Sequence, residues 1–113
     1  MAKLTVAAIS ERSFQAPTLT IFASIADETG LSVQDLDVGN FTIEWLDQNV
    51  QLGVKSVETL GPSASAGFYR IDVNFTEPEP WPQGVYNLGL VVDVFNAGKP
   101  DDNGQTVLRA VVL

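Results

Sequence analysis

The chain has 113 residues, of which 45% are hydrophobic, and its net charge is -8, from 14 acidic and 6 basic side chains. This length and composition predict a single globular domain over residues 1–113 that needs neither a metal nor a disulfide to fold. The acidic excess repels phosphate, and the six cations are scattered along the chain. We therefore exclude nucleic acids and anionic membrane surfaces as partners.

Apolar and polar residues alternate through most of the chain, which is the period of half-buried β-strands. Strands are predicted at about residues 3–9, 18–25 and 41–45, followed by a less regular run at 50–60 that holds one strand or two. Further strands are predicted at 69–75 and 86–94, and from 108 to the C-terminus. One helical turn is expected at Ser32–Leu36, capped by Ser32. Gly- and Pro-rich turns separate the strands, so the pattern predicts an all-β antiparallel sandwich of about seven strands.

Two stretches resemble the sequence pattern of bacterial immunoglobulin-like modules. One is Val33-Gln-Asp-Leu-Asp-Val-Gly-Asn-Phe41-Thr-Ile43, and the other is Gly84-Val-Tyr86-Asn-Leu88, which is similar to a tyrosine corner. Trp45 stands where such domains often carry a core tryptophan, and Leu88 replaces the cysteine of an antibody-type disulfide. The resemblance implies an immunoglobulin-like β-sandwich that serves as an adhesion, assembly or spacer module.

The residues that most catalytic sites need are missing. The chain has no cysteine and no histidine, which excludes thiol nucleophiles, thiolate metal sites and serine–histidine pairs. The carboxylate pairs, such as Asp35 with Asp37 and Asp101 with Asp102, fall in predicted exposed loops where solvent keeps them ionised. We therefore expect a protein that is not an enzyme and needs no cofactor.

Acidic residues would gather at one end of an immunoglobulin-like sandwich, where alternate loops cluster. The residues concerned are Asp27, Asp35, Asp37, Asp101 and Asp102. Calcium binds roughly six to eight oxygen ligands, so this cluster predicts a weak Ca²⁺ site. The alternative is that these residues only build solvated turns, which their turn propensity explains without a ligand.

Trp81 lies between Pro80 and Pro82 in a predicted loop. An exposed tryptophan there would stack on a sugar ring or anchor a protein partner. The alternative is that the indole folds over the end of the sandwich beside Tyr86, since large apolar side chains are usually at least partly buried.

The last two predicted strands carry apolar residues on both faces. If their even positions face the core, the outward side chains are Val85, Val91, Phe95, Val107, Val111 and Leu113. Phe22 and Phe68 also lie opposite the apolar stripes of their strands. A polar outer face is the norm, so this surface predicts contact with a partner protein or a second copy of the chain. The alternative is that another segment covers it.

The chain shows no targeting or membrane-spanning pattern. Its first residues lack the apolar stretch of a signal peptide, and no run approaches about 18 apolar residues. We expect no membrane insertion, and either a cytoplasmic protein or a module of a longer secreted one.

Overall fold

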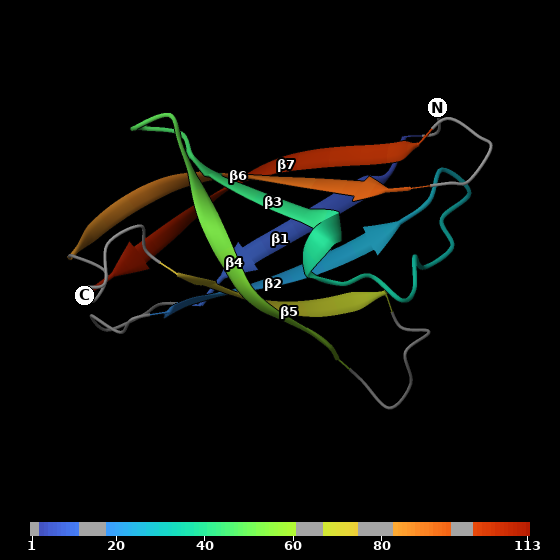
Figure 1. The fold of residues 1–113 in the computed structure, drawn as a ribbon, viewed down its shortest axis with the longest axis horizontal. Helices are drawn as coiled ribbons and strands as arrows, with labels where there is room; N and C mark the ends of the chain where they lie inside the picture. The colour runs from blue at the N-terminus through green and yellow to red at the C-terminus, as the bar shows by residue number, and fades with distance from the viewer. Residues whose placement is uncertain (1–2, 12–17, 61–66, 75–82, 96–100) are drawn as a thin grey trace.

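Seven antiparallel strands form the computed structural model, which describes residues 3–11, 18–60, 67–74, 83–95 and 101–113. The strands, which are labelled in Figure 1, are hydrogen-bonded in the order β1-β2-β5-β4-β3-β6-β7. Their bounds are β1 Thr5–Ser10, β2 Thr18–Ala26, β3 Phe41–Trp45, β4 Val50–Thr59, β5 Phe68–Asn74, β6 Gly84–Val94 and β7 Asp102–Val112. The predicted all-β antiparallel fold is confirmed, and the run at 50–60 is one strand.

Strand β4 joins the two halves of the sheet. Its first residues pair with β3, with Val50 opposite Trp45 and Leu52 opposite Ile43. From Gly53 onward it pairs with β5 instead, and the register shifts between Val54 and Ser56. Such an irregularity bends a strand and increases its twist, which lets β4 cross from one half to the other. The halves are therefore β1, β2, β5 and the end of β4, and β3, β6, β7 and the start of β4.

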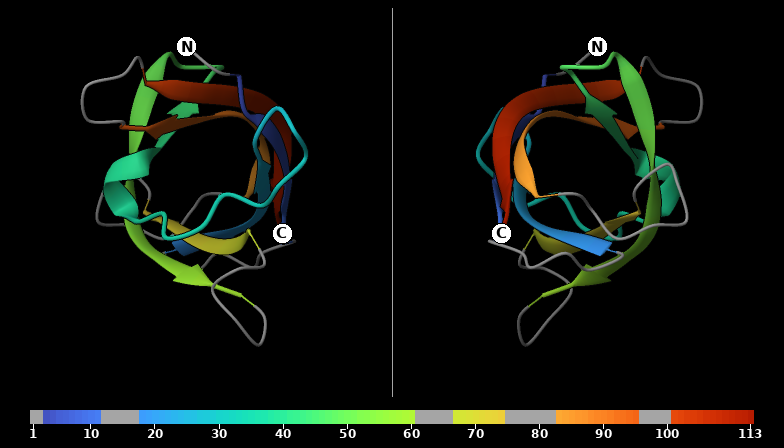
Figure 2. Two further views of the ribbon diagram at one scale, coloured as in Figure 1. Left: turned by 90° about the vertical axis from the view of Figure 1, so that its right-hand side faces the viewer. Right: turned by 90° about the vertical axis from the view of Figure 1, so that its left-hand side faces the viewer.

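The outer strands of the two halves, β1 and β7, meet at a parallel seam. Residues Lys3 and Asn103 form a parallel bridge, and the Leu4 amide donates to the Asn103 carbonyl at 2.7 Å. Gly104 allows this approach, because a Cβ at that position would lie 2.5 Å from the Leu4 oxygen. Viewed end on, the strands enclose a nearly complete ring (Figure 2). The molecule is therefore barrel-like, although the sequence predicts a sandwich of two separate sheets.

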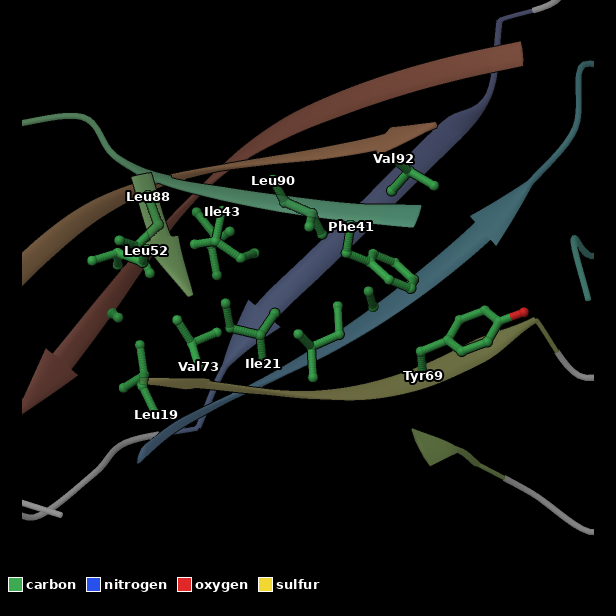
Figure 3. Close-up of a cluster of buried hydrophobic side chains, with 14 of the residues drawn as sticks. Leu19, Ile21, Phe41, Ile43, Leu52, Tyr69, Val73, Leu88, Leu90 and Val92 are labelled. Carbon is green, nitrogen blue, oxygen red and sulfur yellow. The ribbon is translucent and has the colours of Figure 1, made fainter. Parts of the chain in front are cut away.

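Alternate residues of every central strand fill the interior. On β6 the buried positions are Tyr86, Leu88, Leu90 and Val92, and on β2 they are Leu19, Ile21, Ala23 and Ile25. Figure 3 shows Leu88, Leu90 and Val92 of β6 and Leu19 and Ile21 of β2 pointing into one cluster with Phe41, Ile43, Leu52 and Val73. The inward faces predicted for the strands at 86–94 and 108–112 are confirmed, since Leu108, Ala110 and Val112 are also buried.

Tyr69 fastens the segment before β3 to the barrel. Its side chain is fully buried, and its hydroxyl donates to the Val33 carbonyl at 2.6 Å and accepts from the Leu36 amide at 3.4 Å. Asp35, between these two points, has a positive φ of 61°, which aspartate tolerates better than most residues. One hydroxyl therefore holds both sides of a left-handed turn.

Three local predictions differ from the structure. The helical turn is a 3-10 turn at Val38–Asn40, capped by Asp37, not one at Ser32–Leu36 capped by Ser32. The capping box of Asp37 and Asn40 explains its position, because each side chain bonds the other's backbone amide. Strand β7 begins at Asp102 instead of 108, since its pairing with β6 continues to Val94 opposite Asp102. Trp45 is only partly buried, because β3 ends there.

Candidate interaction surfaces

The structure gives the predicted acidic residues local roles. The Asp27 carboxylate accepts hydrogen bonds from the Thr29 amide at 2.9 Å, the Thr29 hydroxyl at 2.6 Å and the Leu31 amide at 3.0 Å. The Thr29 hydroxyl bond is the main reason that the pKa of Asp27 is lowered. Asp37 accepts from the Val38 amide at 2.7 Å. These bonds close the turn after β2 and cap the 3-10 turn.

Within the described part of the chain, no three acidic residues lie close enough together to hold a metal ion. The structure therefore does not gather Asp27, Asp35, Asp37, Asp101 and Asp102 into one site. Trp81, the predicted sugar- or partner-binding residue, lies outside the described residues.

The outer face of β3, β6 and β7, which we call the β6–β7 face, carries the apolar residues that the sequence places there. Four of the six are exposed, with Val85 at 57%, Phe95 at 65%, Val107 at 68% and Leu113 at 42%. Val91 and Val111 are partly buried. The outward orientation is as predicted, but the six do not form one continuous row.

A polar crossing divides the β6–β7 face. Asn87 lies opposite Arg109, between the Val85–Val111 pair and the Gly89–Val107 pair. The Asp47 carboxylate accepts from the Asn87 amide at 3.1 Å and from its side chain at 3.0 Å, and the Asn87 side-chain oxygen accepts from Arg109 Nε at 3.3 Å. The Asn87 bonds lower the pKa of Asp47. This network ties the turn after β3 to β6 and β7.

Beyond this crossing, a groove follows β6. Its first hollow, of about 360 Å³, is lined by Glu44, Leu46, Gly89, Val91 and Val107 among others. Leu46 packs against the backbone of Gly89, so closely that a Cβ at Gly89 would lie 3.3 Å from the Leu46 side chain. A second hollow, of about 270 Å³, continues past Asp93 and Lys3 and shares Val91 and Gln105 with the first.

A second apolar surface lies on the opposite half of the barrel. The β1–β2–β5 patch consists of Ala7, Ile9, Phe22, Leu60 and Phe68, which line a hollow of about 250 Å³ with almost no polar surface. The strand register explains it, because Ile9 lies opposite Phe22, and Ser24 lies between Ala7 and Phe68. Phe22 and Phe68 face outward, as the alternation of their strands predicts, whereas the sequence gives no signal for Ile9 and Leu60.

A cluster of polar groups borders this patch. The Asp72 carboxylate accepts from Thr20 Oγ1 at 2.8 Å, Ser56 Oγ at 3.2 Å and Arg70 Nε at 3.4 Å. Burial alone would raise the pKa of Asp72, but the hydroxyl bonds and the Arg70 charge outweigh it, and that pKa is lowered. The cluster gives a charged edge to an otherwise apolar surface.

No protein-family model, curated protein sequence or solved structure matches the chain. Across the described ranges, no helix has the length and apolar character needed to span a bilayer.

Proposed function

We propose that this chain is an immunoglobulin-like protein-interaction module that acts without catalysis and binds its partner through the β6–β7 face. The strand order supports the family assignment. Constant-type immunoglobulin domains place strands A, B, E and D in one sheet and C, F and G in the other. The order β1-β2-β5-β4 followed by β3-β6-β7 is the same arrangement, with β4 paired to both halves.

The observation that carries the proposal is the exposure of Val85, Phe95, Val107 and Leu113. Single exposed apolar side chains are ordinary on a protein surface, but one sheet face that carries four of them, two on either side of the polar crossing, supports a contact site. At about 25 cal/mol per Å² of apolar surface removed from water, covering them yields several kcal/mol. Association costs offset much of this gain, so a partner affinity in the micromolar range is expected.

The direction of the carboxyl pKa shifts supports a non-catalytic role. A general acid that works near neutral pH needs a carboxyl whose pKa is raised. Among the described residues, every carboxyl pKa with a resolved shift is lowered, namely those of Asp27, Asp47 and Asp72.

The test is a selection for peptide ligands. A library of random peptides displayed on phage is panned against the immobilised protein, and enriched peptides are then measured against two variants. Phe95→Lys with Val107→Lys places two charges on the β6–β7 face. Ile9→Lys with Phe68→Lys is the matched control, because it removes one aliphatic and one aromatic residue of similar exposure from the β1–β2–β5 patch.

The proposal expects the enriched peptides to lose binding to the Phe95/Val107 variant and to keep it with the Ile9/Phe68 variant. Circular dichroism confirms that both variants remain folded. If only the Ile9/Phe68 variant lost binding, the contact site would lie on the β1–β2–β5 patch instead. If both variants bound the peptides as tightly as the unmodified protein does, neither apolar surface would have a role in binding.

A further inference from the structure

One row of outward side chains on the β1–β2–β5 patch changes from small to large as it crosses the strands. Ala7 of β1 lies opposite Ser24 of β2, and Ser24 lies opposite Phe68 of β5. Leu60, which follows β4, lies beside Phe68, because its amide donates to the Phe68 carbonyl at 2.9 Å. All four residues line the hollow of about 250 Å³, and none of its described lining residues is charged. The row therefore consists of a recessed half and a projecting half.

This row is complementary to itself. A twofold rotation about a line parallel to the strands, placed between β2 and β5, brings β2 of one copy over β5 of a second copy and β1 over β4. Phe68, whose side chain is 51% exposed, then lies over Ser24 of the second copy, and Leu60 lies over Ala7. In such a contact the same surface serves both copies, so each supplies the projecting and the recessed half.

The next row along the strands carries charges, and the same rotation brings no like charges together. Its residues are Ile9, Phe22, Arg70 and Glu58. Arg70 of each copy would lie over the ring of Phe22 of the other, which is a favourable cation–π arrangement. Glu58 would lie over Ile9, where its aliphatic stem makes apolar contact.

The row after that follows the same rule. Glu11 lies beside Thr20, since its amide donates to the Thr20 carbonyl at 3.0 Å, and Thr20, Asp72 and Ser56 continue the row. The rotation places Asp72 over Thr20 and Glu11 over Ser56 of the second copy. Each acidic side chain thus faces an uncharged one. A contact through this face avoids the like-charge pairs that a net charge of -8 would otherwise impose on self-association.

We propose that the β1–β2–β5 patch binds a second copy of this chain in a twofold dimer. Four strands about 4.8 Å apart and three rows about 7 Å apart cover roughly 400 Å² per copy. Stable interfaces bury about 800 Å² per partner, so this dimer is weak and reversible. The sheet curves around the barrel (Figure 2), which centres the contact on β2 and β5. The β6–β7 face lies on the other half of the barrel and stays free for its partner.

Sedimentation equilibrium tests for the dimer. Protein concentrations from about 10 μM to about 1 mM bracket a dissociation constant near 0.1 mM, which is a reasonable expectation for a contact of this size. The average mass should rise from that of the monomer towards twice that value. In ¹⁵N nuclear magnetic resonance spectra over the same range, the amide signals of Ser24 and Phe68 should shift with concentration, and that of Gly89 should stay constant.

Three variants separate a shape-matched contact from general stickiness. Phe68→Ser removes the projecting ring, and Ser24→Phe fills the recess that receives it, so each should weaken dimerisation by about ten-fold or more. The double variant Ser24→Phe with Phe68→Ser exchanges the two positions, which the rotation again places over each other, and should restore the dimer. Phe95→Ser, the same substitution at a phenylalanine of the β6–β7 face that is 65% exposed, is the matched control and should leave the mass unchanged. Circular dichroism confirms that each variant is folded.

Three results would overturn the inference. The first is a protein that remains monomeric at about 1 mM, well above the dissociation constant expected for this contact. The second is a loss of dimerisation in Phe95→Ser that equals the loss in Phe68→Ser, because the dimer would then use the β6–β7 face. The third is a double variant that stays as monomeric as the single variants, because Ser24 and Phe68 would then not face each other across the twofold axis.

Discussion

Replacing Tyr69 by Phe isolates the effect of one hydroxyl on the fold. The ring stays in place, fully buried and 5.6 Å from the ring of Phe41. The change removes the donor to the Val33 carbonyl and the acceptor of the Leu36 amide, which together bracket the left-handed Asp35. Only the tether of the segment before β3 is lost.

The expected cost follows from these two bonds. A net hydrogen bond stabilises a protein by about 1 kcal/mol, and an abandoned buried partner adds to the loss. Because Val33 is only partly buried, water reaches its carbonyl in part. We therefore expect the free energy of unfolding to fall by about 1–2 kcal/mol. For a domain of this size that lowers the melting temperature by about 4–8 °C.

Urea denaturation followed by circular dichroism measures this loss, and hydrogen exchange at the Leu36 amide reports the tether directly. Exchange there should accelerate more than at Ile71 in the middle of β5. The contrast variant Tyr69→Leu also removes the ring contact with Phe41 and should cost more. A loss below about 0.3 kcal/mol with unchanged Leu36 exchange would refute the tether, because removing a net hydrogen bond should cost more than that.

Other changes have equally defined outcomes. Gly104→Ala should lower the free energy of unfolding by about 1–3 kcal/mol, because its Cβ would collide with the Leu4 backbone. Gly53→Ala, whose Cβ meets nothing within 4 Å, should be nearly neutral in the same urea titration. Trp45→Ala should lower the free energy of unfolding by about 3 kcal/mol, at the low end for a large aromatic because the side chain is partly exposed. The ring centroids of Trp45 and Tyr86 are 5.2 Å apart, and an unchanged denaturation midpoint would contradict a stabilising contact between them. The lowered pKa values of Asp27, Asp47 and Asp72 add stability that is present above their ordinary value of 3.8 and is lost as the pH falls below it. Burial raises the pKa of Tyr69 above 10.0, so the free energy of unfolding should also fall as the pH rises past that value. A free energy of unfolding that stays constant at both low and high pH would contradict these shifts.

The sequence predicted the faces of the strands well, because alternation fixes which side chains enter the core. Leu88, Leu90 and Val92 are buried as expected, and Val85 and Val107 are exposed. Alternation does not report which residues of neighbouring strands lie opposite each other. The polar crossing at Asn87 and Arg109, which interrupts the predicted apolar row, depends on that register.

Non-local pairing also explains the larger differences. The sequence offers no signal that β4 changes partners near Val54, or that Gly104 brings β7 against β1. Ile9 lies on the face of β1 opposite Leu4, Val6 and Ala8, so alternation gives it no core role. Its position beside Phe22 depends on the pairing of β1 with β2. The acidic residues were predicted to meet from fold analogy alone, whereas Asp27 and Asp37 form their bonds within their own turns.

The parallel seam has a mechanical consequence. Because β1 and β7 start side by side, the start of β1 and the end of β7 lie at opposite ends of the barrel (Figure 1). A pull applied at Thr5 and Val112 would act along both strands, so the β1–β2 and β6–β7 ladders would slide in shear instead of opening one bond at a time. The load would be shared over the whole β6–β7 pairing, from Gly84 opposite Val112 to Val94 opposite Asp102. Joined in series with other domains, this barrel would resist extension most strongly along the line of its termini.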